Sequence, residues 1–246
     1  MQDNKGKPWA PVLNAQLRHL MHDSCGVNFT QCLALVRQGA DVNKQDSANR
    51  TLLMRAARDG RADVMQDLIA MGARVDLKDG IGRTALHYAA QRDNPQCIDV
   101  LVAAGACLNS QSIEQWTPLM SAVCNGSVAV VARLLEVGAD AEIKDNRECT
   151  PLMRAVKTVE ITTTAETVKL LLAHGADMGV RDTLGKTIDD ILKEYPPGEF
   201  SEEVKEAIQQ ERDRRTAKAF RSAAGKGTPK PRRIIRKRMG AGYHAG

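Results

Sequence analysis

The sequence predicts an all-α fold made of stacked helical repeats, and three observations support this. Threonine recurs every 33 residues at positions 51, 84, 117 and 150, and again after a longer step at 187. Gly-Ala pairs follow the same spacing, beginning at 39, 72, 105, 138 and 175. Hydrophobic residues make up 43% of the chain but aromatic residues only 3%, which favours helices packed through Leu, Ala, Val and Met over a β-sandwich or barrel.

Each repeat is expected to contain two short helices. The first begins at the repeated threonine, as in 51–57, 84–90, 117–123 and 150–156. Proline follows the threonine in two repeats and suits a first helical turn, where its missing N–H costs nothing. The second helix carries apolar residues three and four apart, such as Val130, Leu134 and Leu135. It is expected to end at the glycine of the Gly-Ala pair, in a left-handed conformation.

The C-terminal part of the chain departs from this spacing. Four extra residues fall within 158–164, between the two helices of one repeat, and Thr163 with Glu166 predicts a capping box that restarts the second helix. A last helix is expected from Ser201, with Val204, Ala207 and Ile208 packed on the preceding repeat. Beyond Glu211 this helix becomes rich in arginine, and it is expected to end near residue 225.

The segments Thr-Pro-Leu-Met-Arg-Ala-Val (150–156) and Val-x-x-Leu-Leu-x-x-Gly-Ala-Asp (168–177) closely resemble the ankyrin repeat. The resemblance implies a solenoid of helix-turn-helix units joined by finger-like turns. Its predicted boundaries are an N-terminal extension at 1–12, a repeat domain at 13–212 and a basic helical and extended tail at 213–246. The repeats, the first and last divergent, are placed at 13–45, 46–78, 79–111, 112–144, 145–181 and 182–212. The family's histidine survives only as His87, with methionine at positions 54, 120 and 153.

The resemblance also implies a binding surface on the concave face, formed by the fingers and the first helices. Carried over by register, the candidate protein-binding residues are Arg50, Arg55, Arg58, Arg83, Tyr88, Trp116, Arg154, Lys157 and Lys186. Exposed arginine and aromatic residues are common anchors of protein interfaces. The alternative is that fingers are polar in any case and that Trp116 packs only on its neighbour.

A second candidate site is the basic C-terminal tail. The chain carries a net charge of +5, but residues 212–246 hold twelve Lys or Arg and one acid, so the first 211 residues carry 5 − 11 = −6. The predicted partner of this tail is RNA or an acidic protein surface; nuclear import and mere solubility are the alternatives. The candidate contacts are Lys226, Lys230, Arg232, Arg233, Arg236, Lys237 and Arg238.

We predict no catalytic, cofactor or metal site and no small-molecule substrate. The His and Cys residues lack metal-ligand spacing, and the Gly-Lys-Thr at 185–187 lacks the first phosphate-loop glycine because position 180 is Val. The six cysteines contain no Cys-x-x-Cys pair and are expected to be reduced thiols. No apolar run reaches membrane-spanning length, and the start lacks a secretory signal. The predicted location is the cytoplasm, with an organellar ribosome, the cytoskeleton or axoneme, and the nucleus as alternatives.

These observations predict a non-enzymatic, protein-binding scaffold. The first interpretation is a structural subunit of a large assembly, such as a ribonucleoprotein, whose basic tail anchors it to ribosomal RNA or an acidic cytoskeletal surface. The alternative is a free cytosolic adaptor or inhibitor that binds one protein through its concave face.

Overall fold

The computed structural model describes residues 10–21, 26–158, 165–194 and 199–225. Within these ranges the secondary structure is entirely helical. The helices are α1 (Ala10–Met21), α2 (Phe29–Arg37), α3 (Leu52–Arg58), α4 (Ala62–Ala70), α5 (Ala85–Ala90), α6 (Pro95–Ala103), α7 (Pro118–Asn125), α8 (Val128–Glu136), α9 (Pro151–Lys157), α10 (Ala165–Ala173), α11 (Ile188–Glu194) and α12 (Glu199–Gly225).

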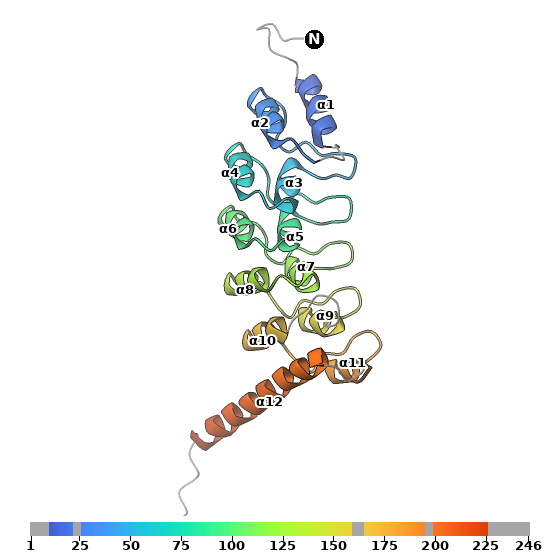
Figure 1. The fold of residues 1–246 in the computed structure, drawn as a ribbon, viewed down its shortest axis with the longest axis vertical. Helices are drawn as coiled ribbons and strands as arrows, with labels where there is room; N and C mark the ends of the chain where they lie inside the picture. Colours follow the sequence, from blue (N-terminus) through green and yellow to red (C-terminus); the bar gives the residue numbers. More distant parts are fainter. Residues whose placement is uncertain (1–9, 22–25, 159–164, 195–198, 226–246) are drawn as a thin grey trace, which may run out of the picture. The chain divides into compact units, whose positions relative to one another are not determined.

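Within residues 1–209 the helices pair as α1 with α2, α3 with α4, α5 with α6, α7 with α8, and α9 with α10, and these pairs follow one another (Figure 1). The first helices contact one another in the order α3, α5, α7, α9 and α11, and the second helices in the order α4, α6, α8 and α10. The loops that join one repeat to the next project beside the first helices. The predicted all-α stack of helix pairs is therefore confirmed.

The repeated threonine caps the first helix of its repeat. The Oγ1 atoms of Thr51, Thr117 and Thr150 accept hydrogen bonds from the N–H groups three residues later, at 3.2, 3.3 and 3.4 Å. Pro118 and Pro151 occupy the first helical position, as predicted. The threonine thus satisfies a backbone donor that the helix itself leaves unpaired.

The second helices end in the left-handed turn that the Gly-Ala pairs predict. At the end of α4, Gly72 has a φ of +90°, its N–H donates to the carbonyl of Ile69, and the N–H of Ala73 donates to the carbonyl of Leu68, both at 2.9 Å. This pattern satisfies the last carbonyls of the helix. It recurs at the ends of α6, α8 and α10.

Small residues bring the first helices together. Alanine occupies the fifth position after the threonine in four consecutive repeats, at 56, 89, 122 and 155, and each of these side chains is fully buried. Leu134 and Leu135 of α8 are buried as well. The core runs through residues 13–208 as one cluster of Leu, Ala, Val and Met with few aromatic side chains.

The chain divides into two compact parts, residues 1–209 and 210–246. In the first part, Val204, Ala207 and Ile208 of α12 are buried, which confirms the predicted apolar face. In the second part, residues 216–222 are exposed. The insertion at 159–164, including Thr163, and the tail at 226–246 lie outside the described residues. None of the described helices combines the length and hydropathy needed to cross a bilayer.

Candidate protein-binding face

Five turns of the same construction join the repeats, and we call them the second to sixth fingers (46–50, 79–83, 112–116, 145–149 and 182–186). In each finger the N–H of the first residue donates to the carbonyl of the fifth, at 2.9–3.1 Å. Each finger is also tied to the next one by a backbone hydrogen bond. An example is the bond from the N–H of Ile113 to the carbonyl of Ile81, at 3.0 Å.

An aspartate opens four of the five fingers and organises each of them. In the third finger, Oδ1 of Asp79 accepts from the N–H groups of Ile81 and Arg83 at 3.0 and 2.8 Å. Oδ2 accepts from the Tyr88 hydroxyl at 2.7 Å. Burial opposes ionisation of this carboxyl, but these hydrogen bonds outweigh it and lower the pKa of Asp79. Burial and the Asp79 carboxylate raise the pKa of Tyr88 to about 12.

The predicted protein-binding cations are paired with acids of the same face. Arg50 and Arg55 both bind Asp46 at 3.0 Å, and Lys157 binds Asp182 at 2.9 Å. The remaining pairs are Arg58 with Asp59, Arg83 with Asp79, Arg154 with Asp145, and Lys186 with Glu194. Most of these cations therefore hold a finger against a helix and do not form an unpaired basic stripe.

Two of the predicted anchors are not exposed. Arg55 and Tyr88 retain only 6% and 3% of their surface, because each reaches from the first helix of its repeat to the aspartate of its finger. The expectation that they are exposed is wrong. Arg50, Arg58, Arg83, Trp116, Arg154, Lys157 and Lys186 are half-buried.

Apolar residues at the fingertips form a surface that the sequence argument missed. Ile81, Ile113 and Leu184 are 51%, 70% and 75% exposed. Ile81 and Ile113 lie on adjacent fingers joined by the backbone hydrogen bond described above. A comparison of finger sequences would have found them, because these fingers carry a large aliphatic residue where others carry small or polar ones.

The fourth finger differs from the others in its first residue, which is Ser112 in place of aspartate. Ser121 stands on α7 where the second, third and fifth repeats carry Arg55, Tyr88 and Arg154. A hollow of about 270 Å³ opens between the third and fourth repeats at this point. Its lining residues are Ile81, Arg83, His87, Gln91, Ser112, Ile113, Glu114, Trp116 and Ser121.

His87 and Trp116 connect the two repeats that border this hollow. The N–H of Thr84 donates to Nδ1 of His87 at 3.1 Å, so Nε2 carries the proton and donates to the carbonyl of Trp116 at 2.9 Å. Burial lowers the pKa of His87 to about 4. The guanidinium of Arg154 lies over the indole of Trp116, 4.8 Å from its centre. Trp116 therefore packs on a neighbouring repeat and still lines the hollow.

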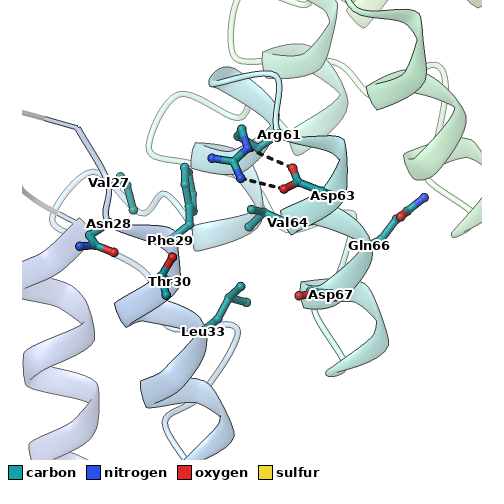
Figure 2. A pocket seen from close by; sticks show the side chains of 10 residues that line it. All are labelled: Val27, Asn28, Phe29, Thr30, Leu33, Arg61, Asp63, Val64, Gln66 and Asp67. Carbon is teal, nitrogen blue, oxygen red and sulfur yellow. Dashed lines mark hydrogen bonds and ion pairs between the residues drawn. The ribbon is translucent and has the colours of Figure 1, made fainter.

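A larger hollow, about 550 Å³, lies between α2 and α4, on the side of the second helices. Figure 2 shows Arg61 directed toward the carboxylate of Asp63, with the ring of Phe29 beside the guanidinium. Arg61 Nη2 lies 2.7 Å from Asp63 Oδ2, and the guanidinium carbon lies 5.8 Å from the ring centre. Arg61 and Asp63 neutralise each other, so neither side chain offers an unpaired charge to a ligand in this hollow.

The predicted tail contacts, from Lys226 to Arg238, lie outside the described residues. On the adjoining part of α12, Arg214, Lys218 and Arg221 are exposed. Cys32, Cys97 and Cys149 are buried thiols, Cys124 is half-buried and Cys107 is exposed. No group of three or more His, Cys, Asp or Glu side chains suited to a metal ion occurs in the part of the chain that the structure describes.

Comparison with known families gives one result. A family model described as ankyrin repeats (3 copies) matches residues 20–112 and 105–182, which together cover residues 20–182 of 246. The search of curated proteins found no match.

Proposed function

Because the chain belongs to the ankyrin-repeat family, we propose that it is a non-enzymatic scaffold that binds a partner protein on its fingers and first helices. Stacked repeats of this kind offer extended binding surfaces. We place the centre of the interface on the third and fourth fingers.

The exposed pair Ile81 and Ile113, beside Trp116 and Arg83, is the observation that supports this location. Exposed large aliphatic residues that adjoin a tryptophan and an arginine have the composition of an interface core. The cations of this face are already paired with Asp and Glu, so the proposed interface depends on apolar contact more than on an acidic partner.

The test is a double variant, Ile81→Ser with Ile113→Ser. Both side chains are mostly exposed, so helix content and melting should stay close to those of the unaltered chain. Loss of an interface anchor should weaken partner binding by about 2 kcal/mol, roughly 30-fold. Leu184→Ser is the matched control, because it removes an equally exposed aliphatic residue from the distant sixth finger. The measurement is the yield of partner protein that co-purifies with each variant. A yield with the double variant equal to that with Leu184→Ser would refute this interface.

We propose a second role for the basic segment at 212–246, which is to anchor the scaffold to a polyanion, with RNA as the first candidate. Its charge of +11 supports this proposal, as does the exposure of Arg214, Lys218 and Arg221, which follow one another at helical spacing on one face of α12. Phosphate contacts release counterions, so affinity for RNA should fall with salt.

Deletion of 226–246 tests the anchor. The six candidate contacts from Lys230 to Arg238 predict a slope of log affinity against log salt of about −4 for single-stranded RNA, and the deletion should remove the salt dependence that these contacts supply. Melting of the repeats should not change, because the core ends at Ile208. If mixed-sequence RNA fails to displace the tail from its natural assembly, the partner is an acidic protein surface and the RNA role is wrong.

A further inference from the structure

Two positions of the fourth repeat differ from those of the second, third and fifth repeats, and both line the hollow at the fourth finger. The first residue of the finger and the fourth residue after the threonine form a bonded pair in three repeats. The pairs are Asp46 with Arg55, Asp79 with Tyr88, and Asp145 with Arg154. In the fourth repeat both positions are serine, at 112 and 121.

The absence of this bonded pair in the fourth repeat explains the hollow. In the second, third and fifth repeats a long side chain crosses from the first helix to the finger, and the aspartate accepts its hydrogen bond. Ser121 is too short to make this crossing, and its hydroxyl donates to the carbonyl of Thr117 at 3.4 Å. The hollow of about 270 Å³ holds the liquid volume of about nine water molecules, which is room for one large side chain.

The groups that line the hollow favour an uncharged aromatic occupant. Ile81, Ile113 and the indole of Trp116 supply apolar surface. Asp is absent at position 112, so a buried cation would lack the carboxylate that neutralises Arg55 and Arg154 in their repeats. Glu114 also lines the hollow, but it lies exposed at the fingertip, where water solvates its charge.

The two serines provide complementary hydrogen-bonding atoms. Ser112 Oγ accepts from the N–H of Trp116 at 3.2 Å, which leaves its hydroxyl proton to donate. Ser121 Oγ donates to Thr117 and retains lone pairs to accept. A phenol both donates and accepts, as the hydroxyl of Tyr88 does between Arg83 and Asp79 in the third repeat.

We propose that the hollow between the third and fourth repeats is a slot for one aromatic side chain, of the tyrosine type, that a partner protein inserts. This inference rests on the proposed protein-binding function and assigns the chemistry of its anchor. In the fourth repeat, the occupant takes the place that is equivalent to the one Tyr88 fills in the third repeat.

The test fills the slot in the two ways that the neighbouring repeats use. Ser121→Tyr supplies the tyrosine of the third repeat while Ser112 stays in place, and Ser112→Asp with Ser121→Arg copies the pair of the second and fifth repeats. Both should preserve helix content, because other repeats hold the same side chain at the fourth position after the threonine. Ala129→Tyr is the matched control, since it adds an aromatic residue to an exposed position of α8 in the same repeat.

Two probes report on the slot. N-acetyl-tyrosinamide should change the fluorescence of Trp116 saturably in a Trp9→Phe background, where Trp116 is the only tryptophan. Peptides selected from a random display library on the unaltered chain should carry an aromatic residue. Each filled variant should weaken their binding at least tenfold, and Ala129→Tyr should leave it unchanged.

The results separate the slot from the wider interface. Peptides that bind both filled variants as tightly as the unaltered chain, but lose affinity for Ile81→Ser with Ile113→Ser, would refute the slot and support the face. Selected peptides anchored by leucine or arginine would refute its aromatic chemistry. If Ser121→Tyr fails to fold, the comparison uses only the variant Ser112→Asp with Ser121→Arg.

Discussion

Replacing His87 by methionine should remove a pH dependence from the stability of the third and fourth repeats. The imidazole is fully buried, and burial lowers its pKa from 6.5 to about 4. In the unfolded chain the same group titrates near 6.5, so between these values the unfolded state binds more protons. Stability from the neutral histidine is therefore complete above about pH 6.5 and is lost as the pH falls toward 4.

The difference in pKa sets the size of the effect. The fall in the pKa from 6.5 to about 4, at about 1.4 kcal/mol for each unit, corresponds to roughly 3–4 kcal/mol of unfolding free energy. Methionine is an apt replacement, because three other repeats hold a buried methionine there, and Met54 Sδ accepts from the N–H of Thr51 at 3.4 Å. The variant loses the hydrogen bond to the Trp116 carbonyl, which costs about 1–3 kcal/mol at neutral pH.

The two stability profiles should therefore converge as the solution is acidified. Urea unfolding followed by helical circular dichroism at several pH values measures the profiles, and NMR of the imidazole measures the pKa directly. Profiles that stay parallel between about pH 4 and 6.5, or an imidazole that titrates near 6.5 in the folded chain, would refute the reasoning.

Two further predictions concern packing and backbone conformation. Leu134→Ala should destabilise the stack by about 2–5 kcal/mol, as truncation of buried leucine does, and an unchanged urea midpoint would contradict this. Gly82→Ala and Gly185→Ala both place a side chain at positive φ, which should lower the free energy of unfolding by roughly 1–2 kcal/mol each. Only at Gly82 does the added Cβ lie 3.0 Å from the backbone nitrogen of Ile113, so Gly82→Ala should lower the midpoint further. Equal losses would show that this close approach is relieved without cost.

The sequence predicted the helices and their ends because those signals are local. A threonine cap acts three residues away, and a terminal glycine acts within one helical turn. The spacing of 33 residues repeats these signals, which makes each instance support the others. The stacking order then follows, because one apolar face must pack on the next.

The sequence did not predict the burial of Arg55 and Tyr88, because that burial depends on a partner nine residues earlier in the finger. The cations of this face are neutralised by acids that lie close to them in the fold, and a residue's type alone does not reveal such a pair. The hollow was missed for a related reason, since it arises from the absence of a pair at Ser112 and Ser121. Aligning the repeats of the chain with one another would have shown both changes.

Some hydrogen bonds and ion pairs of the fingers lie within one repeat, and others join a repeat to the next one. The two kinds have different consequences when a repeat is duplicated or lost. A pair such as Asp79 with Tyr88 lies within one repeat, so a duplicated copy carries its own neutralised charge into any position of the stack. The bonds from His87 to Trp116 and from Lys157 to Asp182 join a repeat to its successor and are broken when the order changes. Moving the second repeat should therefore break no ion pair of its finger, whereas moving the third repeat without the fourth, or the fifth without the sixth, breaks a side-chain bond to the next finger.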